Sequence, residues 1–324
     1  MTKNRKAVAA AIAGLAILLA GWLTFGAWYG SGPLEKDRTF MVRTGDSLGA
    51  VASRMEEEGI ISSARAFTLR ARVFGGGSPI KAGEFLIPAG ASPSRILSII
   101  QSDDVIRRLV TIPEGMPSIM VRDRLMAQPH LTGDIPVPAE GSILPDSYDF
   151  ERGETREAVL RRMQTAMTAT LAEAWAKRGP NIAVKTPQEA LVLASIVEKE
   201  TGKPSERRMV AGLYSNRLKK GMLLQADPTI IYPITQGKPL GRRIRQSEIQ
   251  AVNGYNTYTM TGLPEGPITN PGKASIEAVL NPATTGALYM VADGSGGHQF
   301  SVTLEQHNAA VEKWFAIRRA RGEM

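Results

Sequence analysis

The sequence predicts an α+β protein with one membrane-spanning helix at its N-terminus, a small strand–helix–helix–strand module and a larger mixed α+β domain. Three observations support this prediction. An uncharged apolar run follows the first six residues, short strands and amphipathic helices fill the next segment, and the remainder lacks both βαβ alternation and a glycine-rich phosphate-binding motif. The chain has 324 residues, enough for about two domains with sizeable cores.

The N-terminal residues have the pattern of a membrane anchor. Residues 1–6 contain three basic side chains, and residues 7–30 contain no charge. A helix of roughly 20 apolar residues crosses a bilayer, and flanking cations favour the cytoplasmic side. We therefore expect a cytoplasmic tail, a single-pass transmembrane helix over 7–30 and a linker over 31–37, with the rest of the chain outside the cytoplasm.

A cleaved signal peptide is the alternative for this segment. Its apolar region would be shorter and would end in small residues at a cleavage site. Here the run continues through Trp22, Phe25, Trp28 and Tyr29, which suit the interface at the outer face of a bilayer. The sequence therefore favours an anchor over a cleaved leader.

A small module is predicted over residues 38–103. Its first strand leads through a Thr-Gly-Asp-Ser turn into an amphipathic helix, for which either Asp46 or Ser47 supplies the cap. A second helix ends at three consecutive glycines, and a second strand follows near 80–87. A Ser-Pro pair at Ser92 then signals another short helix.

Residues 104–324 are predicted to form the second domain. It begins with a strand and a proline-rich segment over 128–150, and a hairpin is expected over 287–303 around a glycine-rich turn. Turns and short strands are expected between a helix over 205–222 and this hairpin. The predicted helices are 155–179, 186–200, 205–222 and 305–322.

Composition and charge limit the classes of function. The chain has no cysteine, so disulfides, a thiol nucleophile and cysteine-ligated metals are excluded. Its three histidines have no metal-ligand spacing, and we expect neither a metal nor another cofactor. The formal charge is +8, but the basic residues are scattered and the densest patch, 242–246, is short. We expect no nucleic acid as partner, whereas anionic lipid headgroups or cell-wall polymers suit such a surface.

The helix over 186–200 ends in two carboxylates, Glu198 and Glu200. At 100° per residue they project about 200° apart, so they do not share a site through one helix face. Each continues a mostly apolar stripe. A carboxyl group held against apolar surface in the last turn of a helix keeps its proton to higher pH, which suits a general acid. A solvated helix end is the structural alternative, and the pattern does not decide between the two glutamates.

Two polar segments, 224–232 and 255–272, have the composition of a sugar-binding cleft. Asn, Gln, Tyr and Thr lie among prolines and glycines there, which gives rigid loops with many hydrogen-bonding groups. An ordered, turn-rich segment without a ligand would have the same composition. The candidate substrate-binding residues are Glu198, Gln225, Asp227, Asn256, Tyr258 and, in the glycine-rich hairpin, His298.

At these residues the sequence resembles the YceG-like endolytic murein transglycosylases. The resemblance rests on the stretches LASIVEKETG, SNRLKKGMLLQADPTIIY, YNTYTMTGLPEGPITNPG and YMVADGSGGHQFS, with weaker matches at VTIPEGM and EGSILPDSYDF. These stretches occur in the family's order and cover most of the chain from Arg38 onward. The resemblance implies that 38–103 is a LysM-like module and that 104–324 is the catalytic domain.

The resemblance also implies an activity. Family members cleave the β-1,4 bond between N-acetylmuramic acid and N-acetylglucosamine within nascent peptidoglycan strands, leave a 1,6-anhydromuramyl end and are thought to terminate strand growth. Their essential glutamate corresponds to Glu200. Peptidoglycan strands as substrate, peptidoglycan synthases as partners, no cofactor, and a periplasmic catalytic domain anchored in the inner membrane follow from the same resemblance.

Three alternative functions stay open. One is a membrane-anchored peptidoglycan-binding protein without activity. Another is a muramidase that uses water, with Asp227 or Glu198 as a second carboxylate, because ordinary glycosidases use two carboxylates. The third, a nucleic-acid binder, is suggested by net charge alone.

Overall fold

The computed structural model describes residues 2–323, apart from the side chains of residues 2–7, 9–10, 17–20 and 23. It divides into two compact units, one that ends at Arg108 and one that begins at Leu109. Helices and two-stranded sheets occur in both units, so the prediction of a mixed α+β protein is confirmed.

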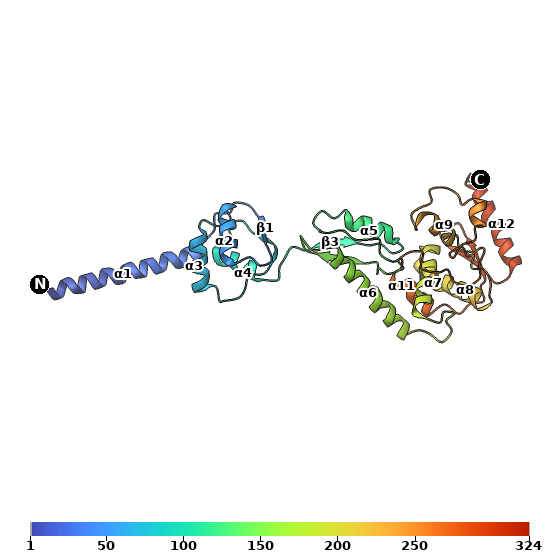
Figure 1. Cartoon of the computed structure of the whole chain (residues 1–324), viewed down its shortest axis with the longest axis horizontal. Helices are drawn as coiled ribbons and strands as arrows, with labels where there is room; N and C mark the ends of the chain where they lie inside the picture. The colour runs from blue at the N-terminus through green and yellow to red at the C-terminus, as the bar shows by residue number, and fades with distance from the viewer. Residues whose placement is uncertain (1, 324) are drawn as a thin grey trace. The chain divides into compact units, whose positions relative to one another are not determined.

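The elements follow one another as labelled in Figure 1. Up to Arg108 they are α1 (Thr2–Tyr29), β1 (Arg38–Val42), α2 (Leu48–Glu57), α3 (Ala64–Phe74), β2 (Gly83–Ile87) and α4 (Pro93–Gln101). From there they are β3 (Arg108–Thr111), α5 (Ser118–Met126), β4 (Ser147–Phe150), α6 (Arg156–Ala176), α7 (Pro187–Glu200), the 3₁₀ turn η1 (Pro204–Glu206), α8 (Arg207–Lys219), α9 (Asp227–Thr235), α10 (Gln246–Ile249), α11 (Lys273–Leu280), β5 (Tyr289–Ala292), β6 (His298–Ser301) and α12 (Leu304–Ala320).

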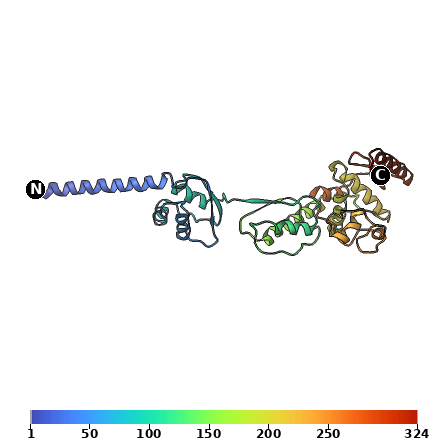
Figure 2. The same ribbon diagram turned by 90° about the horizontal axis from the view of Figure 1, so that it is seen from above.

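Helix α1 covers the segment predicted to cross a membrane and is continuous in both views (Figure 1, Figure 2). Within the described part of the chain, no helix combines the length and the apolar character needed to span a bilayer. Part of the predicted span, residues 7, 9–10, 17–20 and 23, lies outside the residues whose side chains are described. The last turn of α1 is packed, because Trp28 is buried with its ring 5.9 Å from that of Phe67.

The first unit has the strand–helix–helix–strand order that the sequence predicts. Strands β1 and β2 pair antiparallel, with Phe40 opposite Phe85. The sequence left open whether Asp46 or Ser47 caps α2. In the structure the cap is Ser47, whose Oγ accepts a hydrogen bond from the backbone N–H of Ala50 at 3.2 Å. Buried side chains from both strands and from α2, α3 and α4 form one core, which includes Phe40, Val51, Met55, Phe67, Phe85, Ile96 and Ile100.

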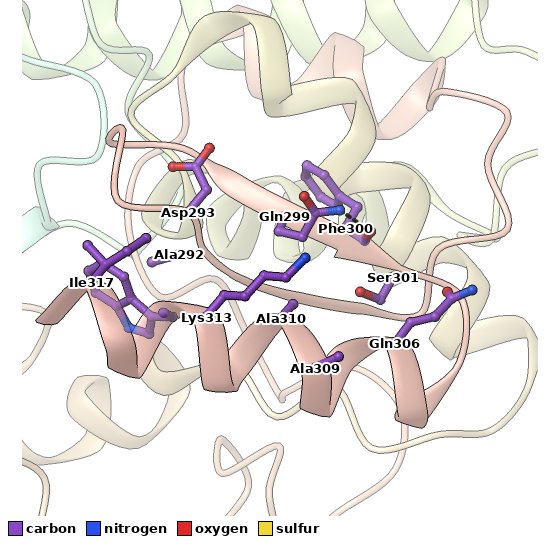
Figure 3. Close-up of a pocket in the computed structure, with 11 residues that line it drawn as sticks. Ala292, Asp293, Gln299, Phe300, Ser301, Gln306, Ala309, Ala310, Lys313 and Ile317 are labelled. Atoms are coloured by element: carbon purple, nitrogen blue, oxygen red, sulfur yellow. Dashed lines mark hydrogen bonds between the residues drawn. The ribbon is translucent and has the colours of Figure 1, made fainter. Parts of the chain in front are cut away.

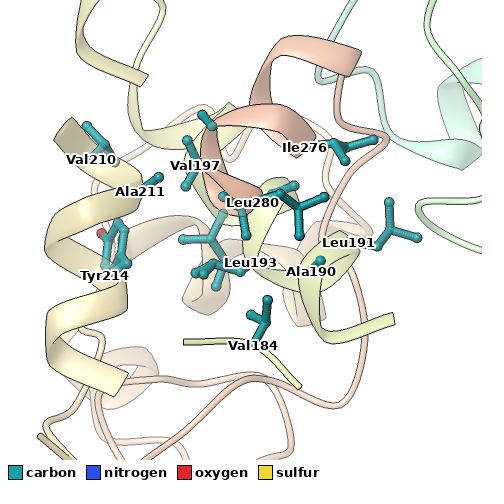
Figure 4. Close-up of a cluster of buried hydrophobic side chains, with 14 of the residues drawn as sticks. Val184, Ala190, Leu191, Leu193, Val197, Val210, Ala211, Tyr214, Ile276 and Leu280 are labelled. Atoms are coloured by element: carbon teal, nitrogen blue, oxygen red, sulfur yellow. The ribbon is translucent and has the colours of Figure 1, made fainter. Parts of the chain in front are cut away.

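Helix α7 is the centre of the second unit. Every residue from Ala190 to Val197 is buried. Figure 4 shows side chains of α7 between those of α8 and α11. The N-terminus of α7 is capped by Thr186, whose hydroxyl accepts from the Glu189 N–H at 3.1 Å. A second cluster around β3, α5, β4 and the start of α6 completes the core of this unit.

The prediction of turns and short strands after α8 was wrong for the short helix α10 and for two longer helices, α9 and α11. Helix α9 contains prolines at 228 and 233, and neither helix has an N-cap side chain from its own neighbouring residues. Local signals for a helix are therefore weak in both segments. The hairpin of β5 and β6 and the closing helix α12 are confirmed.

Candidate active site

Glu200 is the last residue of α7, at the edge of the buried core. The buried stretch Ala190–Val197 holds this helix between α8 and α11, so the direction of the Glu200 side chain is fixed by packing. Glu200 itself is only partly buried, which leaves part of the carboxyl group accessible to a ligand.

Four side chains face Glu200, and together with it they are called here the Glu200 cluster: Glu200, Tyr214, Arg217, Asp227 and Tyr258. Burial, which has the largest effect, and the nearby Asp227 charge together raise the pKa of Glu200 to about 7. A hydrogen bond from the Tyr214 hydroxyl and the charge of Arg217 act in the opposite direction. A carboxyl group with this pKa is protonated in a large fraction of molecules at neutral pH and is suited to general acid catalysis.

Tyr214 and Arg217 were missed as site residues by the sequence reasoning. Both lie on α8 and both are nearly inaccessible, with exposures of 2% and 8%. The Arg217 guanidinium donates to the backbone carbonyls of Leu288 and Leu224, each at 2.7 Å. One signal in the sequence could have identified them. Tyr214 and Arg217 are three residues apart and lie on the apolar side of the helix, which also contains Val210 and Leu213.

The structure brings the side chains of Asp227 and Tyr258 together. The Tyr258 hydroxyl donates to Asp227 Oδ1 at 2.6 Å. The Asp227 side chain is exposed, and that of Tyr258 is partly exposed. These groups therefore present a carboxylate and a phenol at the surface beside Glu200.

Gln225 lies in the same loop in a strained conformation. Its φ is +52°, in the left-handed region that non-glycine residues rarely adopt. The backbone N–H of Gln225 donates to the Thr257 carbonyl at 3.1 Å, and Arg217 contacts its side-chain oxygen at 3.4 Å. The exposed Gln225 side chain is thus held near the Glu200 cluster.

Two buried threonines fix the loop that carries Gln225 and Asp227. The hydroxyls of Thr229 and Thr257 are 2.8 Å apart, and Thr257 Oγ1 accepts from the Ala226 N–H at 3.1 Å. The Thr257 N–H in turn donates to Thr229 Oγ1 at 3.2 Å. This threonine lock joins the start of α9 to the segment that contains Tyr258, so the position of Asp227 depends on both.

Glu198 does not face the Glu200 cluster. Its Oε2 accepts from the Gly272 N–H at 3.0 Å and from the Ser275 hydroxyl at 2.7 Å, both at the N-terminus of α11. Its Oε1 lies 3.6 Å from Arg207 Nη2, and the side chain is only 6% exposed. Glu198 therefore acts as the N-terminal cap of α11, and these contacts leave it no access to a substrate.

The structure gives Asn256 a role inside the loop. The residue is completely buried, and its amide nitrogen donates to the carbonyls of Glu248, Ile249 and Ala251. Its side-chain oxygen accepts from the Tyr258 N–H at 3.0 Å. Asn256 thus orients the backbone at Tyr258, which corrects the expectation that its side chain contacts a sugar.

His298 is also engaged by protein groups. Its Nδ1 lies 2.9 Å from Glu206 Oε2, and its backbone N–H donates to Glu206 Oε1 at 3.1 Å. The pair ties the first residue of β6 to the turn η1, which follows the catalytic-site helix α7 in the chain. Within the described residues, no group of three or more His, Asp or Glu side chains is placed to hold a metal ion.

Glu140 is a second acidic residue with a raised pKa, and the sequence reasoning did not single it out. Burial raises its pKa to about 7. One carboxyl oxygen accepts from the backbone N–H of Ser118 at 2.9 Å, the Ser118 hydroxyl at 3.1 Å and Asn270 Nδ2 at 3.2 Å. Tyr232 of α9 also hydrogen-bonds to it. These contacts join α5, α9 and the segment before α11 around one carboxyl group.

Comparisons with known proteins identify the family of the chain. Residues 40–313 match the YceG-like family. A protein of Bacillus subtilis (strain 168) named endolytic murein transglycosylase is 27% identical in an alignment 322 positions long that covers 88% of each chain. A protein of the same name from Streptococcus pneumoniae (strain D39) is 26% identical over 81% of this chain, but the match spans only 55% of that longer protein.

A solved structure shows the same fold. The crystal structure of a YceG-like protein from Listeria monocytogenes aligns with 85% of this chain and 99% of its own, with a TM-score of 0.52 and 26% identity. The profile match covers both the Glu200 cluster and most of the first unit. The chain therefore belongs to the YceG-like family.

Proposed function

We propose that the protein is an endolytic murein transglycosylase that cleaves the β-1,4 bond between N-acetylmuramic acid and N-acetylglucosamine within peptidoglycan strands and leaves 1,6-anhydromuramyl ends. The observation that carries this proposal is the Glu200 carboxyl group, partly accessible and with a pKa of about 7. Two relatives are named endolytic murein transglycosylase, which supports the proposed class of reaction.

The proposed reaction needs one acid that later acts as a base. Protonated Glu200 donates its proton to the glycosidic oxygen as the bond to the muramyl C1 breaks. The muramyl C6 hydroxyl then forms the new bond to C1, and the Glu200 carboxylate accepts the proton that this hydroxyl loses. No water is consumed, so a second carboxylate that activates water is not required.

Asp227 has a supporting role in this mechanism. Its charge raises the pKa of Glu200, so it helps to keep the acid protonated before the reaction. The same charge favours the positive charge that develops at C1 in an oxocarbenium-like transition state. The hydrogen bond from Tyr258 fixes the direction of the Asp227 carboxylate.

A water-using muramidase is the second candidate function, because Asp227 places an exposed carboxylate beside Glu200. In that reaction Asp227 would activate water or form a covalent intermediate, and the product would have an ordinary reducing end. Glu198 is a poor candidate for this role, since its carboxylate caps α11.

The cellular location of the protein and the identity of its first unit are also part of this proposal. We place the catalytic domain, residues 104–324, on the periplasmic side, anchored to the inner membrane through the N-terminal helix, where it meets nascent strands and the synthases that make them. Exposed apolar side chains on α1, among them Ile12, Leu15 and Trp22, support an anchoring role. The antiparallel β1–β2 pair with α2 and α3 supports a LysM-like module over residues 38–103.

The chemistry of the new chain ends tests this function. Uncross-linked glycan strands are digested with wild type, Glu200→Gln and Glu198→Gln, and the ends are identified by mass spectrometry. Ends lighter than a reducing end by one water are expected from wild type and from Glu198→Gln, and none from Glu200→Gln. Circular dichroism confirms that each variant is folded.

Two outcomes would redirect the assignment. Reducing ends from wild type would support the muramidase, with Asp227 as the second carboxylate. Binding of the strands without any cleavage by wild type would support a peptidoglycan-binding protein.

A further inference from the structure

A pocket of about 430 Å³ lies between the β5–β6 hairpin and α12, outside the Glu200 cluster. Figure 3 shows it, with Lys313 extending from α12 across the pocket. Its volume is within the range of about 300–1,000 Å³ that is usual for small-molecule sites. None of the site residues predicted from the sequence lines it. We call it the hairpin–helix pocket.

One face of α12 supplies half of this pocket. Gln306, Ala310, Lys313, Trp314 and Ile317 follow the spacing that puts residues on the same side of a helix, and all of them line the cavity. Ala309 and Ala310 of the same helix also line the pocket. Because these side chains are small, they leave space between the helix and the hairpin. Trp314, Lys313 and Gln306 supply an indole, an amine and an amide to the same pocket.

The polar groups of the pocket include a free donor and a free acceptor. Gln306 Oε1 accepts from the backbone N–H groups of Val302 and Thr303, at 3.0 and 3.4 Å, and its amide N–H groups have no partner among the described residues. Gln299 is the reverse case, since its Nε2 donates to the Phe300 carbonyl at 3.1 Å and its oxygen is left over within the described part of the chain.

The two charged residues of the pocket differ in their engagement. Asp293 accepts from the Ser295 N–H at 2.7 Å and the Gly297 N–H at 3.2 Å, so it holds the turn of the hairpin. The Lys313 amine has no hydrogen bond or ion pair with any residue that the structure describes. The pocket therefore offers a ligand one unneutralised cation, an amide donor, an amide acceptor and an aromatic side chain.

This combination fits a saccharide that carries a carboxylate. Sugar hydroxyls both donate and accept hydrogen bonds, the C–H face of a pyranose packs on aromatic rings, and a carboxylate pairs with a lysine amine. A muramyl unit has all three features, because a lactyl group or its attached peptide ends in a carboxylate.

The hairpin that forms this pocket is fixed to the Glu200 cluster by its other contacts. Arg217 donates to the Leu288 carbonyl at 2.7 Å, and its guanidinium lies 5.5 Å from the centre of the Tyr289 ring. His298 is bound to Glu206, just beyond the end of α7. A ligand in the pocket is therefore held at a set position relative to Glu200.

We propose that the hairpin–helix pocket is a secondary glycan-binding site that holds a muramyl unit of the same strand at a distance from the bond that Glu200 cleaves. This proposal rests on the proposed function for the identity of the strand. Such a site favours cleavage within long strands over cleavage of short ones, because only a long strand reaches both places. Its contribution is to substrate affinity and leaves the chemical step unchanged.

The kinetic test compares short and long peptide-free glycan strands as substrates of the full chain. Lys313→Ala and Gln299→Ala are expected to raise KM for long strands by about tenfold, the equivalent of one lost strong contact, with kcat within about twofold of wild type. With a tetrasaccharide substrate neither variant is expected to differ from wild type. Arg319→Ala, an exposed cation on α12 that does not line the pocket, is the matched control.

Binding is measured separately from catalysis, so that failure of this proposal is distinct from failure of the proposed function. Tryptophan fluorescence is titrated with peptide-free glycan strands, and the response is expected to disappear in Trp314→Phe and to weaken about tenfold in Lys313→Ala. Equal kinetics for the Lys313 and Arg319 variants on long strands, in an enzyme that cleaves them, would overturn the proposal. So would an unchanged titration in Trp314→Phe and Lys313→Ala.

Discussion

Glu198 and Glu200 illustrate how two identical residues in one short stretch acquire different roles. Their spacing predicts that they point to different sides of α7, and the structure agrees: Glu200 faces Tyr214, whereas Glu198 caps α11. The sequence could not decide which one meets which partner. The partners of Glu198 are Gly272 and Ser275, more than seventy positions away in the chain, and local pattern carries no information on that contact.

A second prediction at the residue scale concerns Glu140, whose raised pKa makes the stability of the protein depend on pH. Its pKa is about 7 in the folded protein and 4.5 in a model peptide, so the folded state binds more protons between these values. Its contribution to stability is therefore fully present below about pH 4.5 and is lost as the pH rises through about 7. Glu140→Gln keeps an oxygen to accept from Ser118 but cannot ionise. The variant is thus expected to gain up to about 3 kcal/mol relative to wild type between pH 4.5 and pH 8.

Urea unfolding at several pH values measures this difference. Glu200 also makes the free energy of unfolding depend on pH, and it does so similarly in both proteins. The difference between variant and wild type therefore removes this contribution. A constant difference across the range would show that Glu140 ionises normally in the folded state.

At the scale of elements, the sequence predicted well those helices that carry their own signals. The helices α3, α4, α6 and α7 are directly preceded by Ser63, Ser92, Thr155 and Thr186, whose side chains cap them. The helices α9 and α11 were missed because their stability comes from elsewhere. The threonine lock holds the start of α9, and Glu198 replaces the missing cap of α11. Tertiary contacts of this kind override weak local propensity.

The threonine lock gives a prediction for α9. Thr257→Val removes the hydroxyl that accepts from the Ala226 N–H and bonds to Thr229, and it leaves buried polar groups unpaired. A loss of about 1–3 kcal/mol is expected in urea unfolding. Activity on glycan strands is expected to fall as well, because Asp227 is the first residue of the released helix.

Thr261→Val is the control for this substitution, since Thr261 is exposed in the same segment. It is expected to leave both stability and activity unchanged. Equal effects of the two substitutions would mean that the lock does not position Asp227.

At the scale of the whole molecule, each unit has its own core. The side chains of one cluster all come from residues up to Ile100, and those of the two others all come from Val110 onward. Such units are expected to fold independently. The sequence predicted two folded regions, whereas the Glu200 cluster, assembled from α7, α8, α9 and the loop at Tyr258, depends on packing that single segments do not encode.

Fragments test this independence. Residues 27–108, which keep the buried Trp28 and the ion pair of Arg108 with Glu84, and residues 105–324, which keep β3 whole, are expected to show separate cooperative unfolding transitions by calorimetry, each at the temperature seen for that unit in the full chain. A fragment that unfolds without cooperativity, or at a clearly lower temperature than in the full chain, would contradict independent folding.

The central claim is that Glu200 acts as a protonated acid whose pKa is set by its neighbours, and the pH dependence of kcat/KM on uncross-linked glycan strands tests it most directly. Wild-type activity is expected to fall as the pH rises through about 7, because the acid loses its proton there. Asp227→Asn removes a charge that raises this pKa and is expected to move the fall to lower pH. Tyr214→Phe removes a hydrogen bond that lowers it and is expected to move the fall to higher pH. A wild-type profile that falls near the ordinary glutamate pKa of 4.5, or shifts of the same sign in both variants, would contradict the assignment of Glu200 as the acid.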